Sequence, residues 1–288
     1  GDRLVAGGSS GWLVLTPEEG QLGMPAAAST VQTTSGPLAL DGTTLVSTDE
    51  MQNIALYDIS TAPAQMLALT PAHGPVRGIA LDADYVYAAD SLGLSIFSRP
   101  LLVPLAQVNT PSVPTGLALH DRLAYLPLED GGLAVVDLTL PGGGLERIHD
   151  LRLSRPVQFL PADDDSIYVL SASSLSLITL DRNDQLVILR QAQVEPPPER
   201  GLLLGEFLAA YSDDGLLRLY DPRHLDPTAI PRGQIALTES NGPQIHDLQA
   251  TRSWLYAAFG PDGLGTAQIG QPGAPRLTNA GTVNALLT

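Results

Sequence analysis

The segment GGSSG, residues 7–11, matches the G-x-S-x-G pattern that surrounds the nucleophilic serine of many hydrolases. Ser9 would be that nucleophile. A nucleophile elbow requires a strand, a tight turn and then a helix. The residues that follow, WLVLT, have the composition of another strand. We therefore interpret residues 7–11 as a turn between two strands, with no catalytic serine.

Two acidic segments have residue types that could bind a hard cation. They are ADDDS (162–166) and DRND (181–184). Calcium requires six or more oxygen ligands that converge on one point, and neither segment has the spacing of a calcium-binding loop. Asp and Asn also favour turns, because their side chains bond to nearby backbone groups. We interpret both segments as solvated turns and keep a calcium site as the alternative.

The histidines give no metal-binding pattern. There are five, at positions 73, 120, 149, 224 and 246, and no two have the spacing of metal ligands. Only His246 is expected near the centre of the fold described below. The sequence therefore predicts no metal site and no cofactor.

The composition restricts the partners of the protein. The chain has 31 Asp and Glu against 15 Lys and Arg, and all 15 basic residues are Arg. A formal net charge of −16 opposes binding to nucleic acids and anionic membranes. Without cysteine there can be neither disulfides nor thiolate metal sites, and no apolar run is long enough to insert into a membrane.

Short apolar segments repeat along the whole chain at intervals near 41 residues. RGIALDADYVYAADSLGLSIFS (77–98) and RGLLLGEFLAAYSDDGLLRLYD (200–221) are two of the copies. Each copy has three or four strand-like segments separated by turn residues, a spacing typical of antiparallel β structure. No helix is expected beyond a single turn around His224.

The last copy of the repeat is incomplete. VNALLT (283–288) matches a first strand, and the strands that should follow it resemble DRLVAGGSS and GWLVLTPE at the N-terminus. A ring explains this arrangement, because in a β-propeller the first and last blades are joined. We predict an all-β, single-domain, seven-bladed β-propeller with four antiparallel strands per blade. One C-terminal strand closes it by pairing with three N-terminal strands. The predicted blades are 1–34 with 283–288, 35–74, 75–113, 114–154, 155–197, 198–242 and 243–282.

The third strand of several copies resembles a known family. NIALYDIS, GGLAVVDLT and GLLRLYDPR are similar to the bacterial LVIVD repeat, an alternating apolar strand that ends in Asp, and more loosely to YVTN and WD40-like repeats. The terminal Asp is present only at Asp58, Asp137 and Asp221. The resemblance implies a propeller from a bacterium, located in the periplasm or at the cell surface. A cytoplasmic location stays open.

The register of the repeat places one residue of each blade at the opening of the axial channel. These residues are Gly36, Arg77, Thr115, Gln158, Arg200 and His246, with Asn284 nearby. Two Arg, one His and several amides around one opening could bind an anion or a carboxylate. The alternative is a solvated opening in which the two Arg side chains pair with acidic neighbours.

Propellers present broad, rigid faces, and no catalytic set stands out in this sequence. We therefore expect a non-catalytic module that binds a protein partner through a propeller face, and a monomer. The alternatives are a propeller enzyme, such as a lactonase-like hydrolase, and a binder of small anionic ligands at the axial opening. EPPPER (195–200) is expected to link an outer strand to the next inner strand, or to serve as a proline-rich ligand for a partner.

Overall fold

The computed structural model of the 288-residue chain is built from β-strands. It describes residues 4–8, 11–15, 17–18, 21–22, 27–28, 36–61, 63–139, 147–152, 156–162, 166–181, 186–225, 227, 230–237, 244–250, 254–268, 276–278 and 285–287. Within these ranges the one helical element is a 3-10 turn, η1 (Pro222–His224). The sequence predicted this single turn.

Six sheets are each made from four consecutive antiparallel strands. The first contains β6 (Leu38–Asp41), β7 (Thr44–Thr48), β8 (Asn53–Asp58) and β9 (Gln65–Pro71). The second contains β10 (Gly78–Leu81), β11 (Tyr85–Asp90), β12 (Gly93–Ser98) and β13 (Pro104–Asn109). The third contains β14 (Ala118–His120), β15 (Leu123–Pro127), β16 (Gly132–Asp137) and β17 (Arg147–Arg152).

The other three sheets repeat the same order from the axis to the rim. The fourth contains β18 (Pro156–Pro161), β19 (Ser166–Ser171), β20 (Ser174–Leu180) and β21 (Leu186–Gln193). The fifth contains β22 (Pro198–Leu204), β23 (Phe207–Ser212), β24 (Leu216–Tyr220) and β25 (Gly233–Ala236). The sixth contains β26 (Asp247–Ala250), β27 (Trp254–Ala258), β28 (Leu264–Gln268) and β29 (Arg276–Thr278).

A further four-stranded sheet contains strands from both ends of the chain. Its order is β30 (Ala285–Leu287), β1 (Leu4–Gly8), β2 (Gly11–Leu15) and β5 (Ala27–Ala28). The strand β30 pairs antiparallel with β1, so that Val5 lies opposite Leu287. Two short strands, β3 (Pro17–Glu18) and β4 (Gln21–Leu22), form a separate pair.

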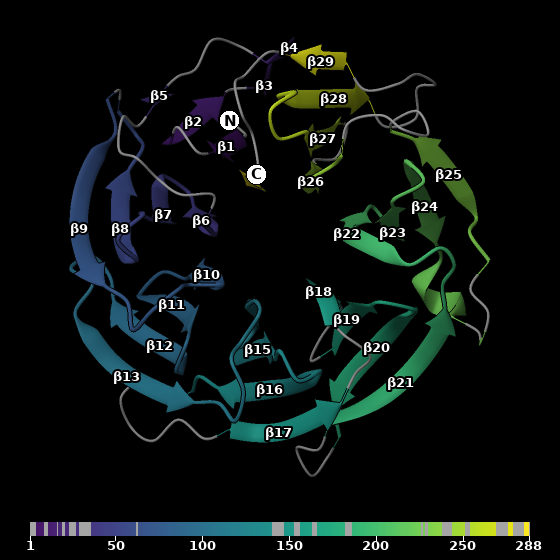
Figure 1. Cartoon of the computed structure of the whole chain (residues 1–288), viewed down its shortest axis with the longest axis horizontal. Helices are drawn as coiled ribbons and strands as arrows, with labels where there is room; N and C mark the ends of the chain where they lie inside the picture. The colour runs from purple at the N-terminus through teal and green to yellow at the C-terminus, as the bar shows by residue number, and fades with distance from the viewer. Residues whose placement is uncertain are drawn as a thin grey trace.

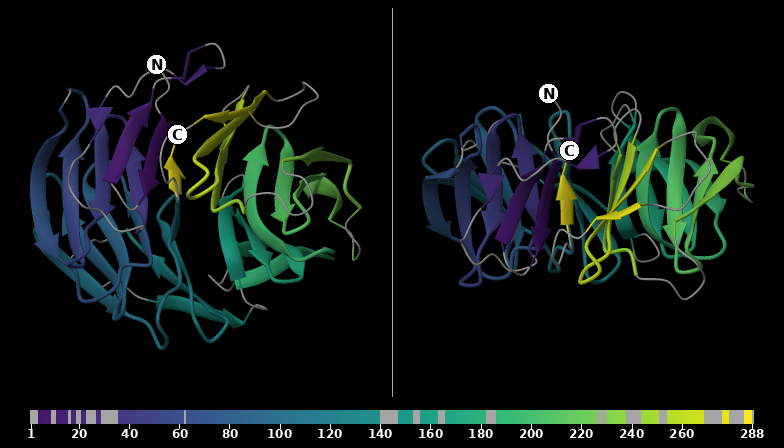
Figure 2. Two further views of the ribbon diagram at one scale, coloured as in Figure 1. Left: turned by 45° about the horizontal axis from the view of Figure 1, so that its top comes forward. Right: turned by 90° about the horizontal axis from the view of Figure 1, so that it is seen from above.

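The sheets stand around an axis, as Figure 1 shows, with their first strands innermost and their fourth strands at the rim. The inner strand β30 contacts both β26 and β6. Figure 2 shows the ring from two further directions, with the two ends of the chain close together. The molecule is therefore an antiparallel β-propeller with four-stranded blades.

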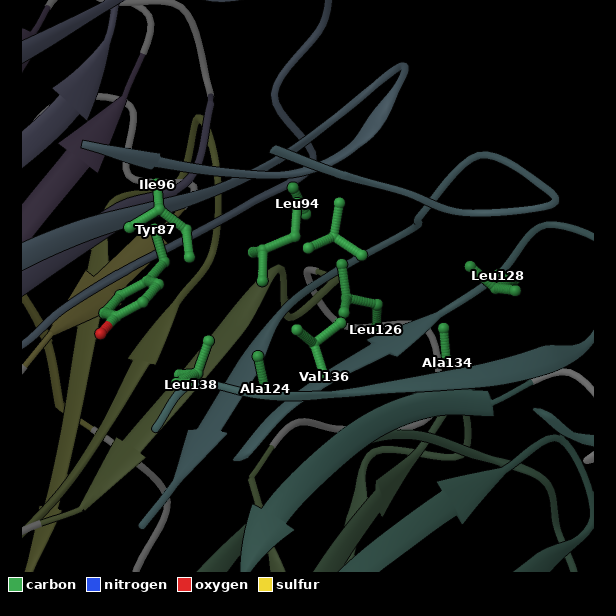
Figure 3. Packing of buried hydrophobic residues seen from close by; sticks show 11 residues of the cluster. Tyr87, Leu94, Ile96, Ala124, Leu126, Leu128, Ala134, Val136 and Leu138 are labelled. Carbon is green, nitrogen blue, oxygen red and sulfur yellow. The ribbon is translucent and has the colours of Figure 1, made fainter. Parts of the chain in front are cut away.

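The apolar core lies between neighbouring blades, because each sheet buries both faces of its second and third strands. One cluster combines Tyr87, Leu94 and Ile96 with side chains of the next blade, among them Leu126 and Val136 (Figure 3). Similar clusters join the other neighbouring sheets. Burial on both faces explains the continuous apolar runs of the middle strands.

Four of the outer strands contain a bulge at the same place. In each, one residue has no register partner on the third strand: Leu67, Leu105, Ile148 and Leu189. A bulge bends an edge strand and increases its twist, which hinders pairing between the edges of two molecules.

Candidate functional site

Three of the residues predicted at the axial opening occupy the same structural position. The backbone N–H groups of Arg77, Thr115 and His246 each donate a hydrogen bond across to the second strand of their blade. The acceptors are the carbonyl oxygens of Ala89, Pro127 and Ala258, each at 2.8 Å. We call this end of the ring the entry face, because here the chain enters the innermost strands.

Two other predicted residues form bonds between blades. The Gln158 Oε1 atom accepts a hydrogen bond from the backbone N–H of Gly201, at 2.7 Å. The Arg200 Nε atom donates to the carbonyl oxygen of His246 at 3.0 Å, and its Nη1 atom donates to that of Glu199 at 2.8 Å. These side chains therefore tie one inner strand to the next. The expected alternative, an Arg200 paired with acidic side chains, does not describe these bonds, because the acceptors are backbone carbonyls.

Arg77 differs from Arg200. Its side chain is exposed, and no hydrogen bond or ion pair to its guanidinium is formed within the part of the chain that the structure describes. Gly36 lies just before β6 and is half-buried. Asn284 lies outside the described residues. The described residues therefore leave one cation, Arg77, available to a ligand near the opening.

Sequence reasoning missed a second group of exposed side chains on the entry face. Met51 and Leu92 stand on the turns between the second and third strands of two neighbouring blades, and Met51 is 80% exposed. The loop from β9 to β10 lies between them. It is fixed on one side by the Ala72 N–H, which donates to the Gln52 carbonyl at 3.0 Å. On the other side the Ser91 hydroxyl donates to the carbonyl of His73, at 2.6 Å.

These contacts create one continuous surface, which we call the junction surface: Met51, His73, Arg77 and Leu92. Each of the two turns is fixed by an aspartate. Asp49 Oδ1 accepts from the backbone N–H of Met51, and Asp90 Oδ1 accepts from that of Leu92, both at 2.9 Å. Apolar side chains are thus held exposed on rigid turns, next to a free Arg. A surface of this kind suits contact with another macromolecule.

Asp90, Ser95 and His73 lie together beneath this surface, but their geometry is not that of a catalytic triad. Asp90 is fully buried, and its Oδ2 atom accepts a hydrogen bond from the Ser95 hydroxyl at 2.7 Å. The His73 Nδ1 atom lies 3.4 Å from the same oxygen. In a triad the serine hydroxyl donates to the histidine, and the histidine donates to the carboxylate from its other nitrogen. Here the serine donates to the carboxylate, so the group holds the loop against the turn.

Ion pairs fix several turns elsewhere. Arg218 binds Asp214 through two hydrogen bonds, one of them at 3.1 Å from Nη1 to Oδ1. The hydrogen bonds from Arg218 lower the pKa of the Asp214 carboxyl below its ordinary value, against an opposing effect of burial. Between blades, Arg99 Nη1 binds Asp41 Oδ2 at 2.7 Å. His224 Nδ1 lies 2.8 Å from Asp221 Oδ2, and this hydrogen bond lowers the pKa of Asp221.

The remaining sequence candidates have the following places. Gly8 and Gly11 are paired in the hairpin of β1 and β2, so a strand follows GGSSG, as predicted, while Ser9 itself lies outside the described residues. The acidic positions 163–165 and 182–184 also lie outside them. Residues 194–197 connect the outer strand β21 to the inner strand β22.

Two searches of the described residues gave negative results. Within those ranges no three His, Asp or Glu side chains come together in a group that could hold a metal ion. No helix in the same part of the chain is long and apolar enough to cross a membrane.

Comparison with solved structures shows the same fold. A functionally unknown protein from Desulfotomaculum acetoxidans is similar over 100% of this chain and 98% of its own, with a TM-score of 0.81 and 11% identity. BamB from Moraxella catarrhalis matches 93% of this chain and 91% of its own, with a TM-score of 0.62 and 15% identity. The β-propeller domain of Cps50 (Swd1) from Myceliophteria thermophila matches 85% of this chain and 82% of its own, with a TM-score of 0.62 and 14% identity.

No protein-family model matches the chain, and no curated protein sequence matches it either. At identities this low the likeness establishes the β-propeller fold alone. The resemblance to LVIVD, YVTN and WD40-like repeats therefore stays a prediction.

Proposed function

We propose that this β-propeller is a non-catalytic module that binds a protein partner through its entry face. The observation that carries the proposal is the junction surface, where Met51 and Leu92 are held exposed on two aspartate-capped turns of neighbouring blades. Exposed apolar side chains beside an Arg are a composition enriched in protein interfaces. Their rigid backbone limits the entropy that is lost on binding.

A cross-linking experiment tests this function. The chain has no Lys, so a carboxyl-reactive cross-linker is needed, and Asp49 and Glu50 place reactive groups next to Met51. The tagged protein is cross-linked in an extract of its native host, and the linked peptides are identified by mass spectrometry. We expect a protein partner linked through entry-face residues, with its yield lowered about tenfold in the variant Met51→Ser, Leu92→Ser.

The variant Ile230→Ser is the matched control, because Ile230 is 79% exposed but lies far along the chain, before β25. It should retain the partner. Equal retention by the wild type, the control and the double variant would contradict the proposed function.

A second candidate function, the binding of a small anion at the axial opening, is supported by the exposed guanidinium of Arg77. Sulfate titrated calorimetrically into the wild type and Arg77→Ala tests it. Loss of the binding heat in the variant supports the site, and an unchanged heat excludes it. Arg200 is a poor choice for this test, because its side chain bonds to the neighbouring strand.

We also propose that the sheet formed by β30, β1, β2 and β5 acts as a seventh blade that closes the ring. The pairing of β30 with β1 supports this, as do the contacts of β30 with the inner strands on both sides. A bacterial, extracytoplasmic location and the propeller-enzyme alternative stay predictions.

A further inference from the structure

The outer strand β9 is an exposed sheet edge without charge. It is the last strand of its sheet, and its seven residues, QMLALTP, include no Asp, Glu, Lys or Arg. Three of its large apolar side chains are exposed: Met66 and Leu69 by 52% each, and Leu67 by 42%. An uncharged apolar edge is a template for pairing with another strand.

The other outer strands are protected or offer less. Charged residues occur in β17 (RIHDLR), β21 (LVILRQAQ) and β29 (RLT). The strand β25 has only four residues, and β13 exposes one large apolar side chain, Leu105. Charges on edge strands oppose pairing with other chains. Among the described outer strands, β9 is thus the edge best suited to accept another strand.

Acidic groups stand at both ends of β9. Asp58 is the register partner of Gln65 at one end. At the other end Ala72 bonds to Gln52, which brings the turn that contains Asp49 and Glu50 against the end of the strand. Residues 36–72 contain four acidic residues and no Lys or Arg. The edge is therefore an apolar strip between two negatively charged ends.

We propose that β9 binds an extended segment of a different protein by strand addition. Apolar side chains of that segment contact Met66, Leu67 and Leu69, and Lys or Arg residues flanking them meet the acidic ends. Strand addition obtains affinity from main-chain hydrogen bonds and specificity from side-chain contacts. A second copy of this chain is disfavoured as the occupant, because two chains of net charge −16 repel each other. This surface lies on the rim and goes beyond the entry-face function proposed above.

The bulge and Pro71 limit how far such pairing extends. The register shift at Leu67 interrupts the edge near its start, and Pro71 has no N–H at its end. The regular part of the edge is therefore short. Side-chain contacts and charge must contribute a large share of the binding, and the test needs to vary both.

The probe is a fluorescent synthetic peptide of alternating Val and Thr, with two Lys at each end, titrated with the full chain in an anisotropy assay. A peptide with Glu in place of Lys tests the charge. A peptide methylated on alternate backbone nitrogens tests the main-chain hydrogen bonds. We expect the Lys-flanked peptide to bind, with affinity lowered about tenfold or more by either change.

Two protein variants locate the binding on the molecule. Leu67→Lys puts a charge into the β9 edge. Leu189→Lys is its matched control, since Leu189 is the bulged residue of β21, is 54% exposed and already has Arg190 beside it. We expect Leu67→Lys to weaken binding of the Lys-flanked peptide about tenfold and the control to change it less than about twofold.

Four results would overturn the proposal. They are no binding of the Lys-flanked peptide, equal binding of the Glu-flanked or methylated peptide, equal losses in the two variants, and wild-type dimers in sedimentation that Leu67→Lys dissociates. The last result would make a second copy the occupant. The variant Met51→Ser, Leu92→Ser should bind the peptide normally, so failure on the rim and failure on the entry face are separable.

Discussion

Single aspartates fix many of the turns of this propeller. Asp49, Asp90, Asp130 and Asp214 each accept a hydrogen bond from the backbone N–H two residues later, in turns between second and third strands. Asp58, Asp137 and Asp221 do the same after third strands. The strand-ending Asp that the sequence showed in three copies is thus a turn-forming residue. Part of the acidic excess of the chain has this structural cause.

Asp90 should be the most sensitive of these residues, because its carboxylate is fully buried and accepts from Leu92 and Ser95. Asp90→Ala leaves buried donors without acceptors, so we expect a loss of about 3 kcal/mol in the free energy of unfolding, measured in urea. Ser95→Ala, which removes one donor, should lose about 1 kcal/mol. Equal effects of the two substitutions would contradict this account.

Asp214 predicts a pH dependence. Because its pKa is lowered in the folded protein, its contribution to stability is present above the ordinary pKa of 3.8 and is lost as the pH falls through the folded value. At pH 7, Asp214→Asn should lower the free energy of unfolding by about 1 kcal/mol, since the pair is partly exposed. Urea titrations should show this difference shrinking in strong acid. A difference that stays constant with pH would refute the role of the ion pair.

At the scale of elements, the inner strands approach one another closely. A Cβ atom on Gly78, in β10, would lie 2.4 Å from the backbone nitrogen of Leu117 in the next blade. On Gly116, which follows Thr115 as Gly78 follows Arg77, the nearest atom would lie at 3.5 Å, an ordinary contact. The spacing of the innermost strands is therefore set by backbone contacts as well as by apolar side chains.

The two glycines give a matched pair of substitutions. Gly78→Ala forces backbone atoms of two blades apart and should cost about 3 kcal/mol in the free energy of unfolding, whereas Gly116→Ala should change it by less than about 1 kcal/mol. Denaturant unfolding measures both. Similar midpoints for the two variants would mean that the inner strands adjust easily.

At the scale of the molecule, the ring depends on the strand β30. Deletion of residues 283–288 removes the partner of β1 and the contacts of β30 with β26 and β6. We expect the truncated chain to lose its cooperative thermal unfolding or to melt about 10 °C lower, as followed by circular dichroism. A truncated chain that melts like the full one would contradict the closing role proposed for the terminal sheet.

The sequence predicted the antiparallel propeller with four-stranded blades, because alternating apolar strands and turn residues recur along the whole chain. It did not predict the roles of Gln158 and Arg200. Whether such side chains face a ligand or bond to the next blade depends on the distance between inner strands, which the repeat does not encode. The contact of His73 with Asp90 was missed for a similar reason, since it joins a connecting loop to the turn of the following blade.

The pairing of β30 with β1 also has a consequence for chain connectivity. Val5 lies opposite Leu287 in the way that Leu40 lies opposite Leu45, across a hairpin of the next sheet. The two ends of the chain thus stand where other blades have a short turn. A linker there, with new ends opened at an exposed turn such as Gly205, would produce a circular permutant. The fold should tolerate it, because every strand would keep its neighbours.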